Sequence, residues 1–314
     1  MSILLTVVFP VFAIILAGYL CGKRRLLGEG ASAGLNQFVY WVALPALLFR
    51  AMARVDTGVL FNGDFWAAYV GGQALTLLIA IAAGCWLFRN SLAEGAMNGM
   101  NSIYGNTGFL GIPLAFAAFG EAATIPTIIT VVVNSALVVG VTTVLIELAL
   151  NKASSGAQLL RHVGRALLKN PMLIAPLAGM LWAASGIPLP AALDTYCELL
   201  GAAAGPCALF AIGLFLVGKP IAADLGEVGV ALLLKLLLQP AITWWLAAEL
   251  LEMPPLWVAV AVIMAATPTG AGSFVMAQQY GVYVQRTSSV ILLSTLLSVL
   301  TLFGLLYHYQ GLML

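Results

Sequence analysis

The chain has 314 residues, of which 62% are hydrophobic and 8% are charged, and its mean hydropathy is +1.05. A soluble domain carries about 25% charged residues, so this composition excludes a soluble protein and predicts an integral membrane protein. The net charge of +1 excludes a basic nucleic-acid-binding surface. The four cysteines show no CxxC pairing, and we interpret them as small core residues.

Ten apolar segments follow one another along the chain, each close to the ~20 residues that span a bilayer. They lie at 3–21, 35–54, 65–88, 96–119, 124–150, 171–186, 195–217, 228–251, 256–280 and 288–310. A basic cluster at residues 23–25 follows the first segment instead of preceding it, which is typical of a membrane span and not of a cleaved signal peptide. The sequence therefore predicts an all-α integral membrane fold with ten transmembrane helices.

Lysine and arginine are unequally distributed between the two sides that these segments define. Ten of them lie on one side, Arg50 and Arg54 lie on the other, and Lys235 lies inside the eighth segment. Because cytoplasmic loops are enriched in basic residues, we expect a multi-pass protein of the cytoplasmic (inner) membrane with both termini on the outer side. The longest connection, residues 151–170, is then a cytoplasmic loop.

Two short motifs recur at one spacing. Residues 16–20 and 177–181 share Leu-Ala-Gly-x-Leu, residues 45–49 and 206–210 share Pro-x-x-Leu-Phe, and both pairs are 161 positions apart. We predict two repeats of five helices, residues 1–150 and 171–314. Since five is odd, the second repeat enters the membrane from the opposite side, and inverted repeats are typical of secondary transporters with a substrate site near the midplane.

The fourth and ninth segments are the least favourable to helix, because glycine and proline lie within residues 98–113 and 266–273. This pattern predicts two discontinuous helices. We expect the N-terminal ends of their second halves near Pro113 and Pro268, where free N–H groups and about +0.5 charge each attract a carboxylate. The alternative is a pair of proline kinks in a packed bundle.

The candidate substrate-binding residues are the polar side chains and prolines around these two breaks. They are Asn101, Tyr104, Asn106, Thr107, Pro113, Thr267, Pro268, Thr269 and Ser273. The amide and hydroxyl groups among them can also form hydrogen bonds with the unwound backbone, because no water is available for this purpose inside a bilayer.

Lys235 is the one basic residue well inside a predicted span, and Gln239 lies one helical turn further on the same face. An intramembrane cation is costly and is usually functional, so we add both residues to the candidate site. Lys235 serves either as the counter-charge of an anionic substrate or as the replacement for a coupling cation. The alternative is a lysine whose ammonium extends to the membrane surface.

The predicted membrane spans lack the residue types that ion coupling or catalysis requires. Asp and Glu fall in loops or at helix ends, Glu147 and Glu249 among them, so we expect no buried carboxylate for a proton relay. GxSxG, HExxH and membrane Asp pairs are missing as well, so we expect a transporter rather than an enzyme, without cofactor or metal. A channel or a sensory receptor remains the alternative from a different class.

Residues 106–114, Asn-Thr-Gly-Phe-Leu-Gly-Ile-Pro-Leu, resemble the fourth-helix motif of the auxin efflux carrier family, which includes the plant PIN-type exporters. The resemblance continues through Asn170-Pro171, residues 210–215, Lys235 with Gln239-Pro240, and residues 268–281. It covers the whole chain, apart from the long cytoplasmic loop of the plant exporters.

This resemblance implies a ten-helix fold like that of the bile acid symporters and NhaA, with helices four and nine crossing at their prolines. It implies a panel domain of helices 1, 2, 6 and 7, through which a homodimer forms, and a moving crossover domain. Bacterial members are described as permeases for malate, malonate or similar acids.

The chain departs from the plant pattern at Gly105, where the plants have proline, and at the small residues 269–272. The pocket therefore differs in shape, and auxin is not carried over as substrate. We expect a carrier that exports a small mono- or dicarboxylate, driven by membrane potential. The alternative is proton- or sodium-coupled uptake of malate- or malonate-type dicarboxylates.

Overall fold

The computed structural model describes residues 2–28, 30–54, 62–150, 161, 164–165, 168–218 and 224–312. Within these ranges the chain is helical, and its β-type pairing is limited to one isolated bridge, Gly105 to Thr269. The expectation of an all-α fold is confirmed. Most of the predicted loop 151–170 lies outside the described residues.

The helices keep to the predicted apolar segments, and several of them contain short π-helical (η) turns. The first half comprises α1 (Ser2–Lys23), α2 (Ala31–Phe38), η1 (Val39–Ala43), α3 (Leu44–Ala53), α4 (Gly63–Leu87), α5 (Leu92–Ile103), η3 (Thr107–Gly111), α6 (Ile112–Phe119), the 3₁₀ turn η4 (Gly120–Ala123), α7 (Thr124–Val132), η5 (Val133–Val138) and α8 (Val139–Ala149). The second half comprises α10 (Pro171–Ala184), α11 (Ala191–Leu216), α12 (Leu225–Leu233), η6 (Leu234–Leu238), α13 (Gln239–Trp244), η7 (Trp245–Leu250), α14 (Pro255–Ala265), α15 (Gly272–Tyr280), α16 (Val284–His308) and the 3₁₀ turn η8 (Gln310–Leu312).

Six continuous helical stretches in the described ranges are long and apolar enough to cross a membrane. They are Ala31–Ala53, Gly63–Leu87, Thr107–Ala149, Ala191–Leu216, Leu225–Leu250 and Val284–His308. Shorter apolar helices occur at Phe9–Lys23, Pro171–Ala184 and Pro255–Ala265. Since each long stretch exceeds the ~20 residues of a span, the chain is a multi-pass membrane protein.

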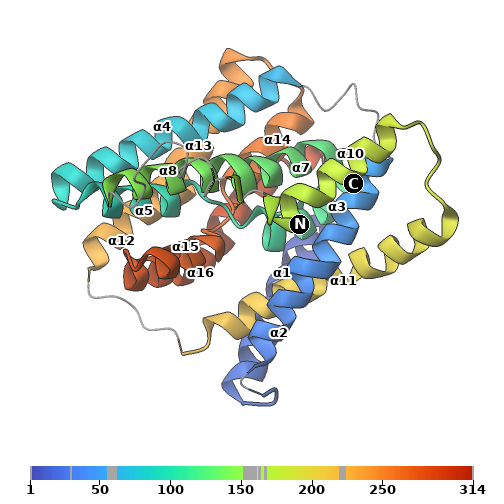
Figure 1. The fold of residues 1–314 in the computed structure, drawn as a ribbon, viewed down its shortest axis with the longest axis horizontal. Coiled ribbons are helices and arrows are strands. Elements are labelled where there is room, and N and C mark those ends of the chain that lie inside the picture. Colours follow the sequence, from blue (N-terminus) through green and yellow to red (C-terminus); the bar gives the residue numbers. More distant parts are fainter. Residues whose placement is uncertain are drawn as a thin grey trace.

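The helices form two groups (Figure 1). The panel bundle contains α1, α2, α3, α10 and α11, in which α11 packs on α1 and α3, and α3 packs on α10. The crossover bundle contains α4 to α8 and α12 to α16, with α4 against α5 and α13, and α16 against α12 and α15. The two bundles meet where η3 and α6 pack against α11.

The recurring sequence motifs contact each other inside the panel bundle. A Cβ atom on Gly18 would overlap the carbonyl oxygen of Phe210, and one on Gly179 would overlap that of Phe49. The Leu-Ala-Gly motif of each half therefore packs on the Pro-x-x-Leu-Phe motif of the other half. Glycine is required at both positions because the helix backbones touch.

Prolines at the second position of a helical stretch account for three of the π-helical turns. Pro45, Pro113 and Pro240 are the second residues of α3, α6 and α13, the helices that begin directly after η1, η3 and η6, respectively. Proline cannot donate a backbone hydrogen bond, and its ring pushes away the carbonyl of residue i−4. The turn before each proline consequently widens without interrupting the helix.

Candidate functional site

The two interrupted helices cross each other at their breaks. The fourth segment is interrupted between α5 and η3, at Tyr104–Asn106, and the ninth between α14 and α15, at residues 266–271. The Asn106 N–H donates to the Pro268 carbonyl at 2.7 Å, and the Gly270 N–H donates to the Tyr104 carbonyl at 2.9 Å. Two short unwound segments thus pair in antiparallel fashion, which satisfies part of the backbone that the breaks expose.

The second half-helices begin at other residues than the sequence predicted. The fourth helix resumes at Thr107, six residues before Pro113, and the ninth resumes at Gly272, four residues after Pro268. We expected both N-terminal ends near the prolines; this is wrong for the fourth helix, which resumes well before Pro113, whereas the ninth resumes about one helical turn after Pro268. Pro113 widens a turn inside the resumed helix, whereas Pro268 lies within the break itself, since the residue before a proline avoids the helical conformation.

Polar side chains from neighbouring helices hold the breaks in place. Asn134 donates from its side-chain nitrogen to the Gly105 carbonyl at 3.3 Å and to Thr107 Oγ1 at 3.0 Å. It accepts in turn from Gln73 Nε2 at 2.7 Å. The Ser294 hydroxyl accepts from the Thr269 N–H at 3.1 Å. The sequence analysis missed these three side chains, although an amide inside the strongly apolar segment 124–150 was a signal for Asn134.

Three of the predicted residues are engaged in holding the backbone. Thr269 Oγ1 donates to the Asn101 carbonyl at 2.7 Å, and the Asn101 amide donates to Thr287 on α16 at 2.9 Å. Thr267 Oγ1 donates to the Met264 carbonyl at the end of α14. All three predicted side chains are buried, so their visible role is to stabilise the crossing.

Asn106 and Tyr104 have polar groups that remain available. Both residues are half-buried, and the Asn106 side chain makes no hydrogen bond to another described residue. The Tyr104 ring lies against Gly270 and Gly272, where a Cβ atom on Gly272 would come 2.7 Å from the tyrosine hydroxyl oxygen. The small residues at 269–272 thus make room for Tyr104, which explains one departure from the plant pattern.

Ser273 and Pro113 complete the predicted set around the breaks. Ser273 is fully buried at the start of α15, and its hydroxyl oxygen has no hydrogen-bond partner among the described residues. Pro113 is half-buried and faces Gly205 of α11 in the panel bundle. The unpaired hydroxyl group of Ser273 therefore lies on α15, and the apolar ring of Pro113 lies between the two bundles.

Lys235 lies inside the crossover bundle and is fully buried. Its ammonium donates to Gln239 Oε1 at 2.7 Å and to the Ala265 carbonyl at 2.5 Å. Gln239 Nε2 donates to the Ile103 carbonyl at 3.3 Å. The alternative of a lysine that extends to the membrane surface is wrong, because the ammonium is bonded beside the breaks.

Two carboxylates are buried near helix ends, contrary to the expectation that none would be. Glu147 is 5% exposed and accepts a hydrogen bond from the Tyr280 hydroxyl at 2.9 Å. Glu227 is 3% exposed and pairs with Arg286 at 3.3 Å. Both glutamates lie close to helix ends, as predicted, but the neighbouring helices cover them.

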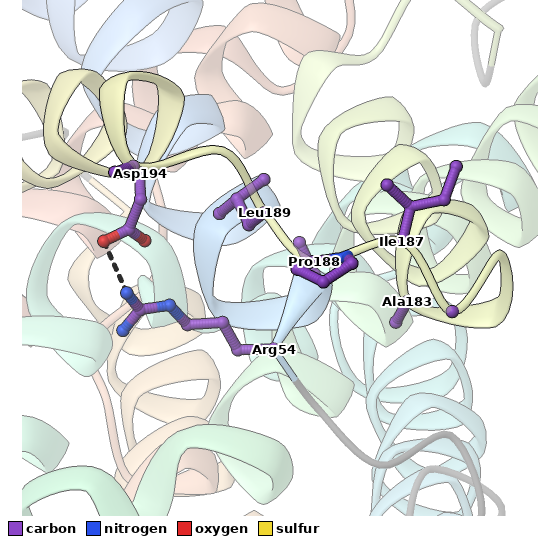
Figure 2. Close-up of a pocket in the computed structure, with 9 residues that line it drawn as sticks. Arg54, Ala183, Ile187, Pro188, Leu189 and Asp194 are labelled. Atoms are coloured by element: carbon purple, nitrogen blue, oxygen red, sulfur yellow. Dashed lines mark ion pairs between the residues drawn. The ribbon is translucent and has the colours of Figure 1, made fainter.

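A separate pocket of about 700 Å³ lies between the ends of α3, α10 and α11 (Figure 2). Arg54 and Asp194 line it and form an ion pair, and Asp194 also pairs with Arg50 at 2.9 Å. The lining contains no residue of either break. We therefore place the candidate site at the crossing and not in this pocket.

The two resumed half-helices differ in how they are covered. Residues of η3 and α6 pack against α11, and α6 also packs against α1. On α15, by contrast, Val275, Gln278 and Gln279 are exposed, Val275 by 62%, as is Ala271 directly before the helix. One face of α15 therefore extends uncovered from the crossing towards the end of the molecule that carries Tyr280.

Comparison with known proteins assigns the whole chain to one group. The family model described as "Membrane transport protein" matches residues 3–306. A "Putative malonate transporter" of Rhizobium meliloti is 34% identical over 96% of this chain and 94% of its own. The "Uncharacterized transporter YfdV" of Escherichia coli is 25% identical, and "Auxin efflux carrier component 8" of Arabidopsis thaliana is 24% identical, each over 93% of both chains.

Proposed function

Because the chain belongs to the membrane transport protein family, which includes the auxin efflux carriers, we propose that it is a secondary carrier for a small organic anion. The observation that carries this proposal is the crossing of two interrupted helices, with the side chains of Asn106 and Tyr104 beside it. Interrupted helices at the midplane expose backbone groups that bind substrates in secondary transporters.

The substrate that we propose is a carboxylate, with malonate as the first to test. The resumed helices begin at Thr107 and Gly272, and each start offers backbone N–H groups and about +0.5 charge. Together the two ends supply roughly one positive charge to a carboxylate group. The name of the 34% identical relative points to the same chemical class.

The architecture that we propose for transport is a pair of inverted five-helix repeats, residues 1–150 and 171–314, joined by a cytoplasmic loop. The reciprocal contacts of Gly18 with Phe210 and of Gly179 with Phe49 support this symmetry. In this proposal the crossover bundle moves against the panel bundle, and a homodimer forms through the panel bundle.

We propose that the protein lies in the cytoplasmic (inner) membrane and that both termini are on the outer side of this membrane. In this orientation the C-terminal ends of α4, α8 and α15 face the cytoplasm. A membrane-impermeant thiol reagent should label Ser185→Cys in intact cells and Gln285→Cys only in permeabilised cells, in a cysteine-free background. The reverse pattern contradicts the orientation.

The test of function is counterflow of labelled malonate in proteoliposomes. Wild-type protein should exchange labelled for unlabelled malonate saturably, whereas a channel does not saturate and a receptor gives no flux. Asn106→Ala should abolish the exchange, because it removes an uncommitted amide at the crossing, and Gln310→Ala, an exposed amide outside the crossing, should not. Unchanged exchange by Asn106→Ala contradicts the site.

A further inference from the structure

The ammonium of Lys235 occupies a position between the C-terminal ends of the two interrupted helices. Ala265 is the last residue of α14, and its carbonyl accepts from the ammonium. Ile103 is the last residue of α5, and its carbonyl accepts from Gln239, which in turn accepts from the ammonium. The ammonium of Lys235 thus bonds the end of α14 directly and is linked to the end of α5 through the side-chain amide of Gln239.

Helix C-terminal ends are electron-rich, and inside a membrane bundle they have no water to compensate them. The last carbonyls of a helix lack partners within the helix, and each end is equivalent to about −0.5 charge. The two ends that meet here therefore amount to roughly −1, which one ammonium neutralises. The groups that bond the ammonium are a carbonyl and an amide oxygen, and neither carries a charge of its own.

The same oxygen atoms are the kind of ligand that a free monovalent cation takes. Backbone carbonyls and amide oxygens replace the hydration shell of alkali cations in channels and transporters. Lys235 is fully buried, so truncating its side chain opens a space in a region whose negative charge is no longer balanced. A cation from solution is the natural replacement.

We propose that Lys235 is a built-in cation of the crossing, which makes a soluble coupling cation unnecessary, and that its removal creates a site for a monovalent cation. The first part of this inference rests on the proposed transport function. The second part concerns the folded protein alone and is tested without any substrate.

The test compares thermal unfolding of the purified protein in sodium, n-propylammonium and choline chloride. The wild-type melting temperature should be equal in all three salts. Lys235→Ala should melt lower in choline and should recover in sodium or n-propylammonium, in proportion to RT ln(1 + [L]/Kd). The n-propylammonium ion restores the atoms that the substitution removes, while choline is too bulky to enter.

Lys235→Met is the matched control, because it removes the charge but fills the space. It should melt lower than wild type in every salt, without recovery. If Lys235→Ala does not fold in choline, purification in sodium or n-propylammonium should recover folded protein. Failure of all salts to stabilise Lys235→Ala, or stabilisation of the wild type by sodium over choline, overturns the inference.

Transport by the wild type gives the second readout. Exchange of malonate should be the same in sodium and in choline buffer, whereas exchange by Lys235→Ala should require sodium or n-propylammonium. Cation-dependent melting without any malonate exchange supports the cation site and contradicts only the proposed substrate. Wild-type exchange that requires sodium contradicts the built-in cation.

Discussion

Asn134 and Asn106 are both asparagines at the crossing, but the structure gives them different tasks. Asn134 makes hydrogen bonds to Gly105, Thr107 and Gln73 and is 2% exposed. Asn106 is half-buried, and its side chain makes no hydrogen bond to another described residue. Substitutions at the two positions should therefore affect different properties of the protein.

Asn134→Ala should lower the free energy of unfolding by about 1–3 kcal/mol, because it leaves the buried Gly105 carbonyl without its side-chain donor. Asn106→Ala should change it by less than about 0.5 kcal/mol, because the substitution keeps the backbone hydrogen bonds of residue 106 and removes a side chain that bonds no described residue. Denaturant unfolding in detergent micelles measures both values. An Asn134→Ala protein as stable as the wild type would show that the amide does not support the crossing.

The sequence was sufficient to identify most residues of the crossing but not their roles. Lys235 and Gln239 could be selected from the sequence because charged and amide groups are rare in apolar segments. The structure shows that both side chains are buried. Whether Lys235 contacts substrate or helix ends depended on Ala265 and Ile103, which are apolar residues that contribute only carbonyls. Backbone groups carry no sequence signal of this kind.

At the scale of elements, the ninth helix is broken by proline and the fourth is not. Pro268 lies inside its break, whereas the fourth helix is interrupted at Tyr104–Asn106, without proline. Pro113, near which we expected the second half-helix to begin, lies after a π-helical turn in a continuous helix. A proline in an apolar segment thus predicts a local widening of the helix as readily as an interruption.

Gly272→Ala should weaken the crossing, because the new methyl group meets the Tyr104 hydroxyl oxygen at 2.7 Å. Overpacking of this kind costs about 1–3 kcal/mol. Combining it with Tyr104→Ala should recover part of the loss, since the obstacle is then gone. The double-mutant cycle, measured by thermal unfolding, isolates the interaction between the two positions.

Gly304 of α16 provides the control, because nothing lies within 4 Å of a Cβ atom placed there. Gly304→Ala should be neutral or stabilising, as alanine is the better helix former. Equal losses from Gly272→Ala and Gly304→Ala would mean that contact with Tyr104 does not explain the glycine.

At the scale of the whole molecule, the driving force for transport depends on which charges cross the membrane together with the substrate. The helix ends near Asn106 provide only partial charges, and Lys235 is bonded to helix ends. Of the two buried carboxylates, Glu227 forms an ion pair with Arg286, so Glu147, which accepts a hydrogen bond from Tyr280, is the one on which proton coupling would depend. The proposed uncoupled carrier and a proton-coupled carrier therefore differ in a measurable way.

An imposed membrane potential should drive malonate accumulation on the positive side of proteoliposomes. Each negative charge that crosses without compensation gains about 2.3 kcal/mol per 100 mV, which corresponds to a gradient of about fifty-fold. A potassium diffusion potential, set with valinomycin at equal pH on both sides, provides the driving force, and labelled malonate provides the readout. In an inside-negative cell the same force is directed outward, so a carrier of this kind exports its substrate. The opposite result would be accumulation that does not depend on the membrane potential, that is driven by a pH gradient and that is lost in Glu147→Gln. This result would instead establish proton coupling through that buried carboxylate.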